Sequence, residues 1–208
     1  MSKHTIKNTG ERKKPLPPRG LVIVYTGHGK GKTTAAMGMA FRAVGAGLKV
    51  LVLQFIKGEW PSGERETAMA LNGIPPLRLR GGEGELRYRE VHNSSQPPLT
   101  LRGGENGLTF GSIDFHIGGR GFIKILGDQK PFAVHRAAAK ALYADALAAL
   151  KSEQYNLVVL DELISAWEEN LLSKQDIIKL IKAKPKMVHL VMTGHDAPRE
   201  IVALADLV

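Results

Sequence analysis

A run of glycine, lysine and threonine residues near the start of the chain has the composition of an anion-binding loop. Gly27-His-Gly-Lys-Gly-Lys-Thr-Thr34 follows an apolar run at residues 21–25 and precedes an alanine-rich stretch. Glycines let backbone N–H groups turn inward without Cβ clashes, and the N-terminus of a following helix adds partial positive charge. Lys32 can reach terminal phosphates, and the Thr33 hydroxyl can sit on Mg²⁺. The segment therefore predicts a loop that binds the phosphates of a nucleotide.

The loop departs from the strict phosphate-loop pattern at one position. The pattern G-x-x-x-x-G-K-[ST] requires a glycine where this chain has Thr26. The competing interpretation is a glycine-rich turn that contains Lys-Thr by chance, but the order of strand, loop and helix favours the phosphate loop. The residues expected to contact the nucleotide here are Gly27, His28, Gly29, Lys30, Gly31, Lys32, Thr33 and Thr34.

Two acidic residues form a second candidate group. Leu157-Val-Val-Leu160 is an apolar run that ends directly in Asp161 and Glu162. Such a strand commonly lies beside the phosphate-loop strand and presents a carboxylate to Mg²⁺, directly or through water. The alternative is that the two acids cap the next helix. With the phosphate loop present, Thr33, Asp161 and Glu162 are the predicted metal ligands.

The elements that must position these groups alternate between strands and helices. Buried strands are expected at residues 21–25, 49–55, 156–160 and 187–192. Helices are expected at residues 33–46, about 64–71, 132–150, 173–184 and 198–205, with Ser173 as an N-cap. This alternation predicts an α/β fold with a mainly parallel sheet. Ligands of such sheets bind beyond the carboxyl ends of the strands, where both candidate groups stand.

Length and composition narrow the class of protein. A chain of 208 residues fits one domain with a sizeable core. It has no cysteine, which excludes disulfides and thiolate metal sites and suits a cytoplasmic setting. No apolar run approaches the ~20 residues that span a bilayer, and the basic N-terminus lacks the apolar segment of a secretory signal. We therefore expect a cytoplasmic protein with no membrane partner.

A third run, at the end of the expected strand 49–55, narrows the function. Gln54-Phe-Ile-Lys-Gly-Glu-Trp-Pro-Ser-Gly-Glu64 resembles the ATP:corrinoid adenosyltransferases, the cob(I)alamin adenosyltransferase family with a P-loop fold. Taken alone, this run would be a strand end followed by a Pro-Gly turn. Further matches follow in order: Arg19-Gly-Leu-Val-Ile-Val-Tyr-Thr-Gly, Gly29-Lys-Gly-Lys-Thr-Thr-Ala-Ala36, Leu160-Asp-Glu-Leu163, and Thr193-Gly194 with Pro198 and Ala205-Asp206. The resemblance covers most of residues 19–72 and 113–208.

The resemblance implies a P-loop NTPase-like α/β fold and a transferase of cobalamin biosynthesis or salvage. Members of the family move the 5′-deoxyadenosyl group of ATP to the cobalt of a reduced corrinoid and release tripolyphosphate. The resemblance also implies Mg²⁺, a homodimer and an electron-donating reductase as partner. Lys32, Thr33 and Glu162 would be catalytic, because they would stabilise the leaving triphosphate. The residues expected to line the nucleotide and corrinoid region are Gln54, Lys57, Trp60, Glu64, Phe122, Gly194 and His195.

Departures from the family pattern keep other interpretations open. The Gly-Phe-Thr-Trp segment of the family is Gly121-Phe-Ile-Lys124 here, and His195 stands where the family often has arginine. The further strand and tail that follow Ala205-Asp206 in the family are missing. One alternative is therefore a degenerate, inactive copy. Another is a P-loop ATPase or nucleotide-binding module that contacts nucleic acid, but such proteins are not expected to carry the run from Gln54, so nucleic acid is not the expected partner.

Two segments differ in composition from the predicted domain, which spans residues 20–208. The net charge is +9, and six of the first 20 residues are Lys or Arg, so residues 1–19 are expected to form a basic, flexible tail. A Gly-rich insertion is expected at about 74–111, where Leu77-Arg-Leu-Arg-Gly-Gly-Glu and Leu99-Thr-Leu-Arg-Gly-Gly-Glu repeat. We expect this insertion to have no catalytic role; the rival interpretation is a pair of hairpins over the corrinoid.

Overall fold

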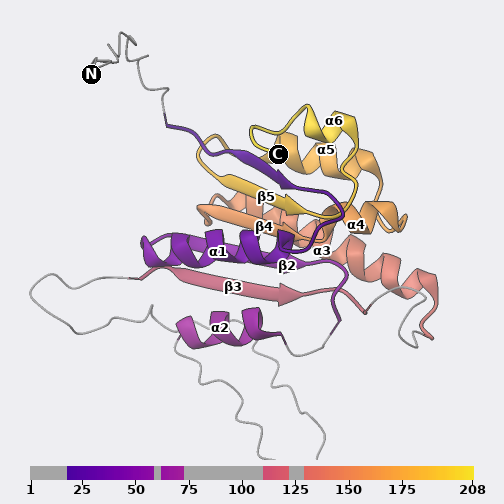
Figure 1. Ribbon diagram of the computed structural model, residues 1–208, viewed down its shortest axis with the longest axis horizontal. Helices are drawn as coiled ribbons and strands as arrows, with labels where there is room; N and C mark the ends of the chain where they lie inside the picture. The colour runs from indigo at the N-terminus through magenta and orange to yellow at the C-terminus, as the bar shows by residue number, and fades with distance from the viewer. Residues whose placement is uncertain (1–17, 59–61, 73–109, 122–128) are drawn as a thin grey trace, which may run out of the picture.

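The computed structural model describes residues 18–58, 62–72, 110–121 and 129–208 (Figure 1). In these residues, five parallel strands form one sheet in the order β1-β5-β4-β2-β3. The strands are β1 (Val22–Tyr25), β2 (Lys49–Gln54), β3 (Ser112–Ile117), β4 (Leu157–Asp161) and β5 (His189–Thr193). The predicted P-loop NTPase-like α/β fold with a parallel sheet is thereby confirmed.

Helices cover both faces of the sheet (Figure 1). One face packs against α1 (Lys32–Gly45) and α2 (Gly63–Leu71). The other face packs against α3 (Phe132–Ser152), α4 (Leu163–Glu168), α5 (Lys174–Ala183) and α6 (Arg199–Val202). Among the described residues, no helix is both long enough and apolar enough to cross a membrane.

Strand β4 shows how the sheet divides its side chains between two cores. Leu157 and Val159 lie in the core beneath α1, whereas Val158 and Leu160 lie in the core beneath α3. Successive side chains of a strand point to opposite faces, so a strand covered on both sides is apolar throughout. The continuous apolar run before Asp161 therefore places β4 in the interior of the sheet, with β5 on one side and β2 on the other.

Helix α5 begins at the predicted cap. The Ser173 side chain accepts a hydrogen bond from the Asp176 backbone N–H at 3.2 Å, and the Asp176 carboxylate accepts one from the Ser173 N–H at 2.8 Å. Burial opposes ionisation of Asp176, but hydrogen bonds from Lys140 and Ser173 outweigh it and lower the pKa of Asp176 to about 2. This reciprocal pair satisfies two backbone donors at the start of the helix.

Two described elements differ from the sequence-based expectation. No strand was predicted where β3 lies, because these residues directly follow the Gly-rich insertion and alternate polar and apolar side chains. Among the described strands it pairs only with β2, and an alternating pattern suits such an edge strand. Helix α4 was also missed, since its six residues are too few for a helical period. The predicted last helix, 198–205, is shortened to α6.

The predicted tail and insertion fall mostly outside the described residues, and their boundaries stay a prediction. The described residues on the two sides of the insertion contact each other. The Asn72 side chain donates to the Ile113 carbonyl at 2.6 Å and accepts from the Ile113 N–H at 3.3 Å. Gly111 is packed as well, because a Cβ there would lie 1.8 Å from the Leu48 carbonyl oxygen. The end of α2 and the start of β3 are thus joined directly.

Candidate active site

The loop between β1 and α1 has the strand, loop and helix geometry that the sequence predicted. Gly27 and Gly31 take positive φ values of 112° and 102°, a region that favours glycine. Gly31 precedes the first residue of α1, and no side chain caps this helix start. Backbone N–H groups in the first turn of a helix lack intrahelical acceptors and attract anions. The loop geometry therefore fits a phosphate group.

Lys32 and Thr26 hold the loop in place from two sides. The Lys32 ammonium donates to the backbone carbonyls of Gly27 and, at 2.7 Å, Gly29. Thr26, which occupies the position of the expected glycine, donates to the His195 carbonyl at 2.5 Å and accepts from the Ala197 N–H at 2.9 Å. The departure from the strict pattern thus ties the phosphate loop to the segment that follows β5.

Asp161 is the centre of a buried hydrogen-bond network. It is 0% exposed, and its Oδ1 accepts from the hydroxyls of Thr33 at 2.9 Å and Thr193 at 2.8 Å. Its Oδ2 accepts from the Gln54 amide nitrogen at 2.9 Å. The network joins the phosphate loop to β2, β4 and β5. Sequence reasoning assigned sites to Thr33, Gln54 and Asp161 but gave no role to Thr193. Its signals in the sequence are its place at the end of a buried strand and the Thr193-Gly194 match to the family.

Glu162 combines two costly features. Its backbone is left-handed, with φ 60° and ψ 24°, and one carboxylate oxygen, Oε2, is buried without a hydrogen-bond partner. Burial and then the neighbouring Asp161 raise the pKa of Glu162 to about 7, against the lowering effects of Lys57 and Lys32. Proteins keep such strain and such unpaired groups mainly at functional sites. These features make Glu162 a candidate to contact a ligand.

The oxygens of Thr33, Asp161 and Glu162 fit a hard cation such as Mg²⁺. Glu162 Oε2 needs a partner, and the Thr33 hydroxyl uses its proton on Asp161, which leaves its lone pairs available. No group of three or more His, Asp or Glu side chains suited to a metal lies within the described part of the chain. A cation here would therefore take further ligands from phosphate oxygens and water, as Mg²⁺ does at nucleotide sites.

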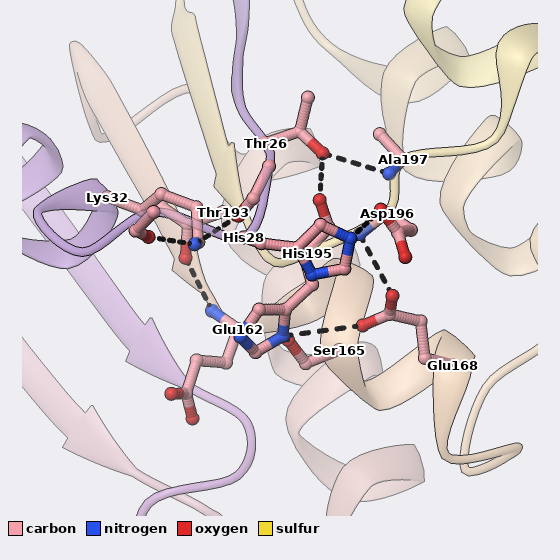
Figure 2. Close-up of polar contacts among 12 residues, drawn as sticks. Thr26, His28, Lys32, Glu162, Ser165, Glu168, Thr193, His195, Asp196 and Ala197 are labelled. Carbon is pink, nitrogen blue, oxygen red and sulfur yellow. Dashed lines mark hydrogen bonds and ion pairs between the residues drawn. The ribbon is translucent and has the colours of Figure 1, made fainter.

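Two histidines lie beside the phosphate loop (Figure 2). The ring centroids of His28 and His195 are 6.2 Å apart. His28 Nε2 lies 3.2 Å from Asp196 Oδ1, and His195 Nδ1 lies 3.7 Å from Glu168 Oε2. Each ring thus has a carboxylate next to it, and both histidines that the sequence assigned to the nucleotide region are brought together.

Comparison with known proteins shows the family to which this chain belongs. Residues 18–96 and 100–208 match the family model described as ATP:corrinoid adenosyltransferase BtuR/CobO/CobP. This chain belongs to that family. It is 31% identical to the corrinoid adenosyltransferase of Escherichia coli (strain K12) over 190 residues, 91% of this chain and 75% of the relative. It is 32% identical to corrinoid adenosyltransferase CobA of Salmonella typhimurium over the same shares, and 31% identical to a Sinorhizobium relative over 91% of this chain and 71% of that protein.

Family membership confirms the resemblance and the transferase class, and it disfavours the ATPase alternative. Several residues that are expected to line the site of this corrinoid adenosyltransferase belong to the part of the chain that the structure describes. The charge of Lys57 and a hydrogen bond from its backbone N–H both lower the pKa of Glu162. Glu64 lies in the first turn of α2. Gly194 packs against α4, because a Cβ there would lie 2.4 Å from Ile164 Cβ.

Trp60, Phe122 and Lys124 lie outside the described residues. The segments that lead to Trp60 and Phe122 nevertheless contact each other. A Cβ at Gly58 would lie 2.9 Å from the Gly121 nitrogen, and the Gly121 N–H donates to the Ile56 carbonyl at 3.2 Å. The segments that follow β2 and β3 therefore leave the sheet side by side, at the carboxyl ends of the strands, where the candidate site lies.

Proposed function

We propose that this corrinoid adenosyltransferase transfers the 5′-deoxyadenosyl group of ATP to the cobalt of a reduced corrinoid with intact tripolyphosphate as leaving group. The electron pair of cobalt(I) forms the cobalt–carbon bond as the bond between C5′ and the triphosphate oxygen breaks. No protein group has to gain or lose a proton. The protein must hold C5′ in line with cobalt and stabilise the charge of the leaving triphosphate.

The observation that carries this proposal is that Lys32, Thr33 and Asp161 lie together at the carboxyl ends of the strands. Lys32 is held by the carbonyls of the phosphate loop, and Thr33 is held by Asp161 at 2.9 Å. Both groups are therefore held in position before a ligand binds. Pre-organised charged and polar groups usually make the largest contribution to catalysis of such a reaction. Lys30 and the loop N–H groups, from Gly27 to Thr34, add further positive potential around the phosphates.

Three residues would hold Mg²⁺. The bound ion would neutralise phosphate charge on ATP and on the leaving tripolyphosphate. Thr33 offers a hydroxyl oxygen and Glu162 an unpaired carboxylate oxygen. Asp161 already accepts three hydrogen bonds, so we assign it the task of holding Thr33 and of contacting the ion through water.

The corrinoid and the rest of the nucleotide are assigned to the residues around this centre. They are Gln54, Lys57, Trp60, Glu64, Phe122, Gly194 and His195, with His28 beside His195. The support is the closeness of Lys57 to Glu162 and of His195 to the phosphate loop. A homodimer, an electron-donating reductase and a cytoplasmic location remain predictions from the resemblance and the composition.

The test is an anaerobic assay with ATP, Mg²⁺ and a chemically reduced corrinoid. The cobalt–carbon bond is scored by its light-sensitive spectrum, and the phosphate products are separated by anion exchange. We expect tripolyphosphate to appear in equal amount to adenosylated corrinoid. ADP and orthophosphate as main products, especially with DNA stimulation, would support the ATPase alternative. A protein that binds ATP but forms no cobalt–carbon bond would support the inactive-copy alternative.

A further inference from the structure

The hydroxyl of Thr193 is shared between the two acidic residues at the end of β4. Figure 2 shows its contact with Glu162. Thr193 ends β5 and is 1% exposed. Its Oγ1 lies 2.8 Å from Asp161 Oδ1 and 2.8 Å from the Glu162 backbone nitrogen. One buried hydroxyl thus contacts the side chain of one acid and the main chain of the other.

The chemistry of the groups fixes the direction of both hydrogen bonds. A backbone N–H can only donate, so the Thr193 oxygen accepts from Glu162. A carboxylate can only accept, so the Thr193 proton goes to Asp161. Asp161 Oδ1 accepts a second hydrogen bond from the Thr33 hydroxyl, whose lone pairs are then free for another partner. Thr193 therefore helps to orient the carboxylate that orients Thr33.

Thr193 also supports the strained backbone of Glu162. A left-handed conformation costs a non-glycine residue about 1–2 kcal/mol and persists only where the surroundings enforce it. The surroundings here are the end of β5. Thr193 bonds the Glu162 N–H, and the next residue, Gly194, packs so tightly that a Cβ would lie 2.4 Å from Ile164 Cβ. The conformation leaves Glu162 Oε2 buried and unpaired.

We propose that Thr193 is a positioning residue of the magnesium–ATP site, acting through Asp161 and Glu162. This inference rests on the proposed function. The shape of the side chain alone does not explain its presence, because valine has the same β-branched outline and suits a buried strand at least as well. What valine lacks is the hydroxyl that joins the two acids.

Two variants of the full chain separate the hydroxyl from the shape. Thr193→Val keeps the shape and removes the hydroxyl, whereas Thr193→Ser keeps the hydroxyl and removes a methyl group. ATP binding is measured by calorimetry without corrinoid, once with Mg²⁺ and once with EDTA. We expect Thr193→Val to weaken binding of magnesium–ATP at least fivefold and to leave binding of metal-free ATP within twofold of the unsubstituted protein. Thr193→Ser should stay within twofold in both.

A second readout needs no ligand. Hydrogen exchange at the Glu162 amide should be at least tenfold faster in Thr193→Val than in Thr193→Ser, because the acceptor of that N–H is gone. Thermal unfolding checks that each variant is folded; should the valine variant not fold, Thr193→Ala replaces it in both measurements.

Three results would overturn the inference. They are unchanged magnesium–ATP binding in the variant without the hydroxyl, an equal loss with and without Mg²⁺, and an equal loss in the serine variant. Failure of the proposed function looks different, because the unsubstituted protein would then form no cobalt–carbon bond in the anaerobic assay, whatever the Thr193 variants do to binding of magnesium–ATP. ATP binding by the unsubstituted protein that is no stronger with Mg²⁺ than with EDTA would overturn the inference as well.

Discussion

Polar side chains gather at both ends of the parallel sheet, yet the two ends use them differently. At the amino end, Lys184 Nζ donates to the backbone carbonyls of Gly20 and Val188 at 3.0 and 2.9 Å. A third hydrogen bond, 3.0 Å long, goes to the carbonyl of Pro185. We call Lys184 and these three carbonyls the amino-end clasp. Its ammonium group is satisfied entirely by the protein's own backbone.

At the carboxyl end, by contrast, oxygens are buried and left unpaired. Gln54 Oε1 and Glu162 Oε2 are among the three buried side-chain atoms without a partner in the described residues, and no atom of the amino-end clasp is in that set. Unpaired buried oxygens cost stability, so they mark the end of the sheet that has to receive a ligand. The amino end, which pairs its polar groups, has only to stay folded. Substitutions at the two ends should therefore affect different measurements.

The largest effect is expected from Lys32→Ala and Thr33→Ala at the carboxyl end. Each should lower adenosyl transfer at least about 100-fold, because one electrostatic contact to the leaving group contributes about 3–4 kcal/mol. The measurement is the rate of cobalt–carbon bond formation with ATP and reduced corrinoid. Unfolding temperatures should stay close to that of the unsubstituted protein. Near-normal transfer in either variant would contradict the assignment of this loop as the phosphate site.

The next effect lies at the other end. Lys184→Met keeps the aliphatic stem and removes the donor from the carbonyls of Gly20 and Val188. The Pro185 carbonyl still accepts from the Val188 N–H at 3.3 Å. We expect a loss of about 2 kcal/mol in the free energy of unfolding, measured with urea, because each unsatisfied acceptor carries a desolvation penalty. The transfer rate of the folded variant should be unchanged. A changed transfer rate with unchanged stability would contradict the claim that the amino end serves stability and the carboxyl end serves function.

Glu162→Gln should give a smaller effect of opposite sign on stability. It removes a buried charge that has an unpaired oxygen, so the ligand-free protein should gain about 1 kcal/mol while transfer falls. Urea unfolding and the Mg²⁺ concentration for half-maximal transfer are the two measurements. A loss of stability would mean that the carboxylate is structural. An unchanged Mg²⁺ titration would move the metal ligand elsewhere.

The smallest expected effect is the pH dependence of stability that comes from His189, which lies next to the amino-end clasp. Burial and then the charge of Lys184 lower the pKa of His189 from its ordinary 6.5. The neutral ring accepts from the Leu21 N–H at 3.3 Å. Because the unfolded chain then binds the proton more readily, this contribution to stability is lost as pH falls below about 6.5.

His189→Asn tests that assignment, since the asparagine oxygen can replace the accepting nitrogen but does not titrate. Between pH 7 and pH 5, the unsubstituted protein should lose unfolding free energy relative to the variant. Comparing the two proteins at each pH cancels the titration of every other group. Parallel stability curves would show that His189 keeps its proton equilibrium on folding.

Local patterns in the sequence were enough to predict the phosphate loop, the strand that ends in Asp161 and Glu162, and the α/β fold. Each of these depends on residues that are close neighbours in the chain. Thr26 and Thr193 act instead across long separations, the first with Ala197, 171 positions away, and the second with Asp161, 32 positions away. Strand β3 was hidden for a related reason, because an edge strand is defined by its partner β2 rather than by a continuous apolar run.

The pair of hydrogen bonds between Asn72 and Ile113 also bears on how this chain could change in length. They join the end of α2 to the start of β3, so the chain between them leaves and returns at one fixed point. With both ends anchored, doubling the length of the connection adds only about 0.6 kcal/mol of closure entropy. That point lies at the amino end of β3, away from the phosphate loop. The anchored ends thus fix where this connection begins and ends, and closure entropy puts only a weak limit on its length.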